Sequence, residues 1–323
     1  MKKALIVFGT RPEAIKMAPL YLELKKSKIF ETRLCVTSQH KEMLFQILEF
    51  FKIIPDYNLD VMKPNQNLFG LTSEILNKMK NVLDDYNPDL VLVHGDTTTG
   101  MAVSLASFYN KSKICHIEAG LRTHDKLSPF PEEMNRQIIG TIASLHFAPT
   151  KTSVNALLQE GVNRKYIFQT GNTAIDSILQ ITSSEPTITL KNLRSTELQK
   201  LLKRVVTLPI EKNNRKDPRL ILLTTHRREN HNGGHERIFQ AAISICKKFE
   251  NVFFVLPLHP NPVVQKAAKV LENHKMCVMV VEPMGYVELS ILGMFSNLMK
   301  STFQKLLVIH LFSNCLTLLL NQI

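Results

Sequence analysis

The sequence predicts an α/β protein made of two Rossmann-like domains with a cleft between them. Short apolar runs alternate with helical stretches, which is the pattern of βαβ units in a parallel sheet. The alternation stops near Gly171 and resumes after a charged connector at 191–219, so the sequence contains two such sets. A length of 323 residues also fits two domains better than one.

The first domain is expected at residues 1–172. Its predicted strands lie at 4–8, 32–37, 90–93, 114–117 and 145–148, and its predicted helices lie at 14–26, 41–51, 68–86, 99–109, 132–143 and 150–160. A helix at 173–181 follows and opens the second domain, 173–323, which we expect to be incomplete after about residue 300. The second domain's predicted strands lie at 219–224, 251–256 and 276–281, and its predicted helices lie at 236–249 and 263–273.

Composition argues against several classes of function. Hydrophobic residues make up 44% of the chain and charged residues 21%, as in a soluble globular protein. The net charge is +12, yet basic residues cluster only at 191–219, where nine Lys and Arg stand against three acids without an aromatic residue. A nucleic-acid surface would interleave aromatic side chains with the positive charges. We therefore expect no nucleic-acid partner, and a basic cleft that attracts a phosphorylated small molecule instead.

Cysteine usage and terminal segments predict a cytoplasmic protein without a metal. The five cysteines are scattered without a CxxC pair, and no two histidines have the spacing of a zinc site. The apolar run after Met1 is about five residues long, too short for a signal peptide. The apolar tail at 306–320 is too short and too polar to span a membrane.

Acidic residues follow two successive predicted strands. Asp96 comes directly after LVLVHG, Glu118 directly after ICHI, and the pair Glu132 and Glu133 opens a helix. Because the carboxyl ends of parallel strands face the ligand crevice, these acids indicate proton chemistry or recognition of a polyhydroxylated ligand. For Asp96 an alternative is a capping role at the start of the next helix.

Basic residues gather where the first helix is predicted to begin. In GTRPEAIKMAPL, Gly9 allows a tight turn and Pro12 suits a first helical turn, so Arg11 and Lys16 stand near a helix N-terminus that favours anions. The structural alternative is that Arg11 simply pairs with Glu13.

Two further polar loops follow predicted strands in the second domain. In TTHRREN, His226 and Arg227 could donate to phosphate or carbonyl oxygens, because this cluster is too polar for a core. In LPLHPNPVV, His259 and Asn261 lie between three prolines, and either a cleft-lining or a structural role fits them.

Seven ordered motifs resemble those of the bacterial non-hydrolysing UDP-N-acetylglucosamine 2-epimerases. They are GTRPEAIKMAPL, TSQHKEML, VHGDTTTG, HIEAGLRTHDKLSPFPEEMNR, GNTAIDS, THRREN and LHPNPVV, between about residues 3 and 286. The resemblance implies the fold of the B-type glycosyltransferase superfamily and a homodimer without a cofactor. It also implies interconversion of UDP-GlcNAc and UDP-ManNAc, a surface-polysaccharide precursor, by elimination and re-addition of UDP.

The resemblance also implies roles for individual residues. Asp96, Glu118 and Glu132 are the acid and base candidates, and His226 stands beside the leaving diphosphate. Substrate-binding residues would be Arg11, Lys16, Arg136 and Arg227. A second, activating UDP-GlcNAc would be bound by Gln39, His40, Gln66, His259 and Asn261, although Asn65 stands where the family often has an arginine.

The chain departs from the family pattern after EPMGY. A DSGGxQEEA stretch that would hold the uridine diphosphate and ribose is missing, and the change of composition resembles a frameshift or truncation. We therefore expect little or no epimerase activity from this chain. The alternatives are an inactive protein that binds sugar nucleotides, a hydrolysing relative, or a glycosyltransferase of the same fold.

Overall fold

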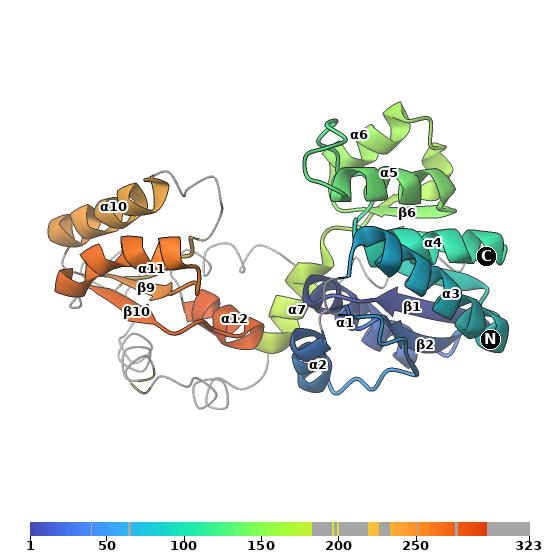
Figure 1. Ribbon diagram of the computed structural model, residues 1–323, viewed down its shortest axis with the longest axis horizontal. Coiled ribbons are helices and arrows are strands. Elements are labelled where there is room, and N and C mark those ends of the chain that lie inside the picture. The colour runs from blue at the N-terminus through green and yellow to red at the C-terminus, as the bar shows by residue number, and fades with distance from the viewer. Residues whose placement is uncertain are drawn as a thin grey trace. The chain divides into compact units, whose positions relative to one another are not determined.

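The computed structural model describes residues 1–39, 41–63, 66–182, 196, 199, 219–225, 233–249, 251–274 and 277–295. The chain divides into two compact units, the first formed by Met1–Ser177 and the second beginning at Ile178. The division falls inside helix α7 (Thr173–Thr182), whereas the sequence suggested a boundary directly before this helix. Each unit is an α/β structure around a parallel sheet, as the sequence predicted (Figure 1).

The first unit contains a seven-stranded sheet in the order β3-β2-β1-β4-β5-β6-β7, with every pairing parallel. Its strands are β1 (Lys2–Phe8), β2 (Phe30–Val36), β3 (Tyr57–Asn58), β4 (Leu90–His94), β5 (Lys113–Ile117), β6 (Leu145–Ala148) and β7 (Ile167–Gln169). The strand order reverses direction between β1 and β4. In doubly wound sheets the ligand crevice opens at the carboxyl ends of the strands at this reversal.

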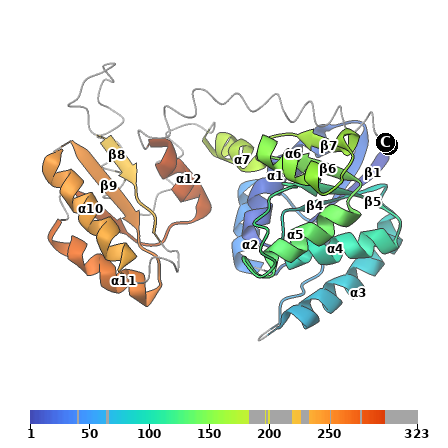
Figure 2. The same cartoon turned by 90° about the horizontal axis from the view of Figure 1, so that it is seen from above.

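Helices cover both faces of this sheet (Figure 2). They are α1 (Arg11–Lys26), α2 (Lys41–Phe50), α3 (Leu68–Tyr86), α4 (Thr98–Tyr109), α5 (Glu132–Ile142), α6 (Lys151–Gln159) and the first part of α7, with a short 3-10 helix, η1, at Arg164–Tyr166. The central strands are buried on both sides, and residues 4–8 have no exposed surface. This burial explains why their sequences are continuous apolar runs and do not alternate.

The second unit, in the part that the structure describes, has a three-stranded parallel sheet in the order β10-β9-β8. Its elements are β8 (Arg219–Leu222), α10 (Gly234–Lys248), β9 (Val252–Pro257), α11 (Pro262–Ala268), the 3-10 helix η3 (Lys269–His274), β10 (Val278–Val281) and α12 (Tyr286–Phe295). Phe239, Phe254 and Leu256 lie in its core. The helix predicted at 263–273 is α-helical only to Ala268 and continues as the 3-10 helix η3.

Four described elements were not predicted, namely the strands β3 and β7 and the helices η1 and α12. The first two have only two and three residues, too few to form a recognisable apolar run. Within the described residues, no helix has the length and apolar character that crossing a membrane requires.

Candidate active site

Two acidic residues lie just after the ends of neighbouring strands, close to the position where the strand order reverses. His94 at the end of β4 is paired in register with Ile117 at the end of β5, so Asp96 and Glu118 follow adjacent strand ends. Gly95 has a φ of +61° and Glu118 a φ of +63°, so both exits turn through the left-handed region. A Cβ placed on Gly95 would lie 4.0 Å from Glu118 Oε1, which shows how close these turns are.

The Glu118 carboxylate is contacted by side chains from three separate parts of the chain, two of which donate hydrogen bonds to it. Lys16 Nζ on α1 lies 2.7 Å from Oε1 and 2.6 Å from Oε2. Asn172, which precedes α7, donates its Nδ2–H to Oε2 over 2.7 Å. His94 Nε2 lies 3.7 Å from the same oxygen. The carboxylate is thus fixed by contacts that span 102 and 54 residues of sequence.

These contacts determine the charge of Glu118. Burial by itself raises the pKa of the carboxyl, but the attraction of His94 and Lys16 outweighs burial and holds the pKa at about 2. Only 11% of the side chain is exposed to solvent. Glu118 is therefore an anion across the neutral range.

Asp96 is engaged by the helix that the acidic pair opens. Its Oδ2 forms an ion pair with Arg136, and its carbonyl oxygen accepts a hydrogen bond from Asn135 Nδ2 over 2.9 Å. The residue that caps α4 is Thr97, whose Oγ1 accepts from the Gly100 N–H over 2.9 Å. The capping alternative for Asp96 is therefore wrong, and its carboxylate is paired with Arg136 instead.

Neighbouring Glu132 and Glu133 have different environments although the sequence does not distinguish them. Glu133 is fully buried and accepts from the Thr123 and His124 N–H groups over 3.1 and 3.2 Å, so it holds the loop before α5. Burial opposes ionisation of Glu133, but these donors outweigh it and lower its pKa. Glu132 is partly exposed, and no hydrogen bond or ion pair engages its carboxylate within the described residues.

Glu13 is occupied elsewhere and does not pair with Arg11. Its Oε2 accepts from the Gly9 and Thr10 N–H groups over 3.1 and 2.8 Å, and its Oε1 accepts from Thr97 Oγ1 over 2.7 Å. This carboxylate therefore ties the turn after β1 to the turn after β4. The alternative in which Arg11 pairs with Glu13 is wrong, and among the described contacts none engages the Arg11 guanidinium.

A buried histidine supports the turn that carries Asp96. His116 on β5 has its Nε2 2.7 Å from the carbonyl oxygen of Gly95. Burial lowers its pKa to about 3, so the ring is neutral at physiological pH. A neutral ring can only donate to a carbonyl oxygen, so Nε2 carries the proton and fixes the backbone next to Asp96.

The remaining predicted residues are distributed over both units. His40, His226 and Arg227 lie outside the described residues. In the first unit, Gln39 Oε1 accepts from Thr99 Oγ1 over 3.2 Å, and the Gln66 N–H donates to the carbonyl oxygen of Lys63.

In the second unit, Asn261 caps α11 by accepting from the Val263 N–H over 2.9 Å, and its own N–H donates to His259 Nδ1. These bonds agree with the structural alternative for Asn261.

Sequence reasoning did not assign a role to His94 or Asn172. Both lie inside motifs that were recognised, VHGDTTTG and GNTAIDS. A histidine that ends an apolar run and an asparagine before a helix usually pack in a core or cap a helix. Nothing in the local pattern shows that they converge on a glutamate on another strand.

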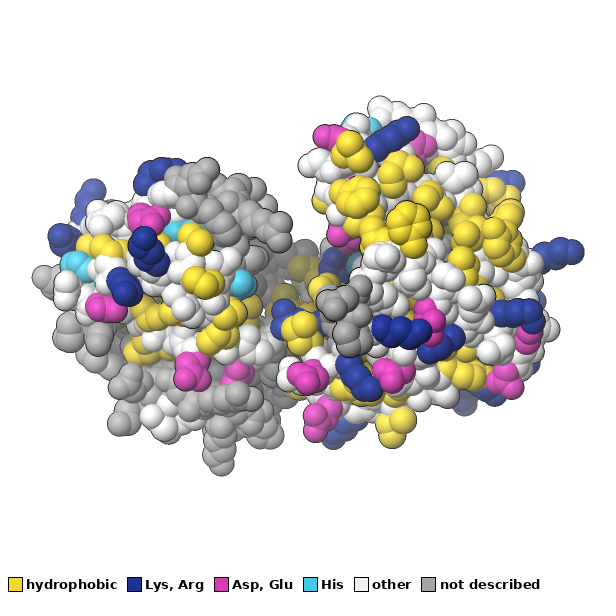
Figure 3. Space-filling view, in the orientation of Figure 1, with side chains coloured by type: hydrophobic (Ala, Val, Ile, Leu, Met, Phe, Trp, Pro, Cys, Tyr) yellow, Lys and Arg dark blue, Asp and Glu magenta, His cyan; other side chains and the backbone are white. Residues whose placement is uncertain are grey.

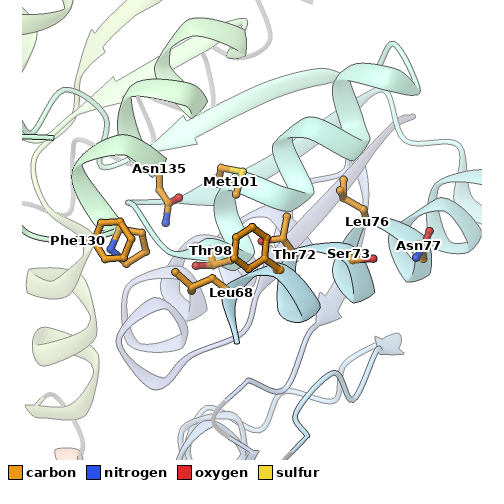
Figure 4. Close-up of a pocket in the computed structure, with 11 residues that line it drawn as sticks. Leu68, Thr72, Ser73, Leu76, Asn77, Thr98, Met101, Phe130 and Asn135 are labelled. Atoms are coloured by element: carbon orange, nitrogen blue, oxygen red, sulfur yellow. The ribbon is translucent and has the colours of Figure 1, made fainter. Parts of the chain in front are cut away.

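An apolar groove of about 530 Å³ adjoins the site. Figure 4 shows it between α3, α4 and the start of α5, with Leu68, Thr98, Met101, Phe130 and Asn135 around it. Phe69 is 86% exposed and Phe130 63% exposed. Hydrophobic side chains gather on the face of the first unit that carries α4 and α5 (Figure 3).

Comparison with known proteins identifies similar chains in several bacteria. The family model described as UDP-N-acetylglucosamine 2-epimerase matches residues 22–300. A UDP-N-acetylglucosamine 2-epimerase of Neisseria meningitidis is 45% identical over 285 residues, which cover 88% of this chain and 73% of the relative. One from Campylobacter jejuni is 46% identical over 288 residues, with 89% and 73% covered.

Solved structures agree with the sequence relatives. The crystal structure of the Neisseria meningitidis UDP-GlcNAc 2-epimerase bound to UDP-GlcNAc has 44% identity and a TM-score of 0.71, over 91% of this chain and 76% of that one. A structure from Listeria monocytogenes, described as a putative UDP-N-acetylglucosamine 2-epimerase, has 40% identity and a TM-score of 0.79, over 92% and 73%.

Proposed function

Because this chain belongs to the UDP-N-acetylglucosamine 2-epimerase family, we propose that its strand-end site interconverts UDP-GlcNAc and UDP-ManNAc. The observation that carries the proposal is the ionised Glu118, held by Lys16 beside the Asp96–Arg136 ion pair at the reversal of strand order. Carboxylates and fixed cations are the groups that this reaction requires. A proton must leave and return at C2, and a negatively charged diphosphate must depart from C1.

The chemistry balances without an external reactant. A carboxylate removes the C2 proton, the C2–H electron pair forms the C1–C2 double bond, and UDP leaves C1 with the electron pair of the C1–O bond. The product is 2-acetamidoglucal. When UDP attacks C1 again and a carboxylic acid delivers a proton to the other face of C2, the sugar has the opposite configuration at C2.

The environments of the acids support a division of roles. Glu118 is ionised whenever substrate arrives, which suits a proton acceptor, and a shift of Lys16 from Glu118 toward the diphosphate would raise its basicity. No hydrogen bond or ion pair engages the Glu132 carboxylate among the described contacts, so it is proposed as a second acid or base at the site. Asp96, paired with Arg136, is proposed to complete the proton chemistry.

Cations near the start of α1 support binding of the diphosphate. The Arg11 guanidinium stands at the N-terminus of this helix, where N–H groups and the helix dipole favour anions. We propose Lys16 and Arg136 as further cations that bind the substrate. His226 and Arg227, which lie outside the described residues, are proposed as donors to the leaving diphosphate. We also propose that a second, activating UDP-GlcNAc is bound by Gln39, His40, Gln66, His259 and Asn261.

Incorporation of deuterium at C2 of UDP-GlcNAc tests the function on the chain as it is. Purified protein is incubated with UDP-GlcNAc in deuterated water and followed by NMR. We expect deuterium at C2 of both UDP-GlcNAc and UDP-ManNAc, and none above background with a variant that combines Asp96→Asn and Glu132→Gln. Binding of UDP without any exchange would instead support the inactive binding protein, and release of free ManNAc would support a hydrolase.

A second copy of this chain is the proposed partner on the apolar groove beside the site. The groove lining contains no charged residue, so two chains of net charge +12 could meet there with little repulsion. The same face on each copy would form a two-fold interface. Asn135 both lines the groove and binds the carbonyl oxygen of Asp96, so the interface would adjoin the site.

Sedimentation of single variants tests the homodimer. Wild-type protein should sediment at twice the mass of one chain, and Phe69→Asp should sediment as a monomer because it places a charge in the apolar face. Ile54, which is 85% exposed outside the groove, supplies the control Ile54→Asp, which should remain dimeric. A monomeric wild type, or a dimeric Phe69→Asp, would contradict this interface.

We also propose that the protein works in the cytoplasm. The four cysteines in the described part of the chain are free thiols, and burial raises the pKa of Cys115 to about 12. Unpaired buried thiols are usual in reducing compartments. Fractionation of cells that express the protein is the direct test.

A further inference from the structure

The motif GNTAIDS contains a residue with two simultaneous bonds. Asn172 lies between β7 and α7, and its Oδ1 accepts from the Ala174 N–H over 2.9 Å, which caps the first turn of α7. Its Nδ2 donates to Glu118 Oε2 over 2.7 Å. Because the Ala174 N–H is a donor and the Glu118 carboxylate an acceptor, the amide satisfies both in one orientation only. Capping of α7 therefore accounts for only half of this side chain.

The hydrogen bond from Asn172 orients the Glu118 carboxylate, whereas the contact with Lys16 does not. The ammonium of Lys16 is a compact charge on a flexible stem, and it lies at similar distances from both carboxylate oxygens. It therefore neutralises the carboxylate without distinguishing the oxygens. Asn172 is a directional donor to Oε2 alone and comes from a helix terminus, so it sets the rotation of the carboxylate plane.

Helix α7 is well placed to hold this donor still. Gly171, with a φ of +80°, allows the chain to turn from β7 into Asn172. At the fifth residue of α7, the buried Ser177 donates to the carbonyl oxygen of Ile15 on α1. Ile15 directly precedes Lys16, so the helices that carry the two donors to Glu118 are also joined to each other.

We propose that Asn172 is a positioning residue for Glu118, orienting its carboxylate through Nδ2 while Oδ1 caps α7. The inference rests on the proposed function for the importance of Glu118, but the bonds that support it are independent of any substrate. Asn172 does not itself touch the reacting atoms in this assignment. It acts through Glu118.

Replacements that keep the cap separate the two roles of Asn172. Asn172→Asp keeps an acceptor for the Ala174 N–H but puts a second anion where Glu118 has its donor. Asn172→Ser keeps a short capping acceptor and removes the donor without adding charge. The matched control is Asn163→Asp, because Asn163 is exposed and caps the 3-10 helix η1 by accepting from the Lys165 N–H.

The readout is the titration of Glu118 in the full chain, followed by carboxyl carbon NMR from pH 2 to 7 and assigned by its absence in Glu118→Gln. The groups facing Glu118 are Lys16 from α1, His94 from β4 and Asn172 itself, and the first two are unchanged in every variant. In wild type the resonance should stay that of the ionised form almost to pH 2. In Asn172→Asp the midpoint should rise by about one to three pH units, by a smaller amount in Asn172→Ser, and not at all in Asn163→Asp.

An unchanged Glu118 midpoint in both Asn172 variants, with normal thermal unfolding, would overturn the inference and leave Asn172 as a helix cap. If Asn172→Asp does not fold, Asn172→Ser alone decides, because it adds no charge. Failure of the proposed function would be visible separately, as absent C2 exchange in wild-type protein. The titration does not involve substrate, so either proposal can fail without the other.

Discussion

The polar strand ends of the first unit differ from the polar loop after β9 in the second unit. Around Glu118, bonds connect residues 102 and 54 positions apart in sequence, from α1 and from the residue before α7. Around Asn261, the bonds connect neighbours two residues apart, with the Val263 N–H and with His259 Nδ1. Long-range bonds fix side chains relative to one another, as a preorganised site requires, whereas local bonds shape a turn and start a helix.

The largest expected effect concerns the acids of the first unit. Asp96→Asn, Glu118→Gln and Glu132→Gln should each lower C2 deuterium exchange by about 10²–10⁴-fold, the usual contribution of a positioned acid or base. The matched control is Glu74→Gln, the same change in a carboxylate that pairs with Lys63 and Lys78 on the surface of α3. Exchange near the wild-type rate in all three site variants would remove the proton chemistry from this set of strand ends.

Stability of the first unit should depend on pH through Glu118. Its folded pKa of about 2 lies below the ordinary value of 4.5, so its stabilising contribution is complete above about pH 4.5 and is lost as the pH falls toward 2. A difference of this size corresponds to about 3 kcal/mol at pH 7. Urea unfolding of wild type and Glu118→Gln should show that difference at pH 7 and a much smaller one at pH 3. Equal stabilities at pH 7 would mean that the bonds to Glu118 do not organise the unit.

The fold and part of the site followed from sequence pattern because each depends on local order. Buried parallel strands are apolar throughout, so runs such as 90–93 mark a strand, and an acid just after the run marks a strand end. The distinction between Glu132 and Glu133 did not follow. Adjacent residues at a helix start point in different directions, and only the loop they face determines which one is buried.

The local sequence pattern also did not predict which residues contact Glu118. Asn172 and His94 reach it across strands, and such a contact depends on strand order, which a single sequence leaves open. The same reason explains why the sequence left open an Arg11–Glu13 pair, since Glu13 bonds to Thr97 after β4 as well as to its own helix start. Local pattern predicted the elements, while the bonds between elements required the topology.

One buried acid of the first unit should have the opposite effect on stability to Glu118. Burial raises the pKa of Asp176 on α7 to about 6, and within the described residues its buried Oδ2 has no hydrogen-bond partner. Its contribution is therefore favourable below the ordinary pKa of 3.8 and is lost as the pH rises through 6. Asp176→Asn should stabilise the protein by about 3 kcal/mol at pH 8 and by much less at pH 4, measured by urea unfolding. Destabilisation at pH 8 would indicate that the Asp176 charge has a partner.

The weakest effect is expected for Asn261 in the second unit, because its bonds connect sequence neighbours. Asn261→Ala removes the acceptor for the Val263 N–H at the start of α11, which should cost about 1 kcal/mol locally and speed hydrogen exchange of that amide. Asn261→Asp retains a capping oxygen and should restore the protection. Because these bonds are local, neither variant should move the Glu118 titration, and at UDP-GlcNAc concentrations that saturate the proposed activating site neither should reduce C2 exchange by more than about twofold. If Asn261→Ala lowered exchange as strongly as the first-unit acids, with the Val263 amide still protected, its side chain would act on the substrate. Local bonding would then be no evidence against a functional site, and the contrast between the two units would have to be abandoned.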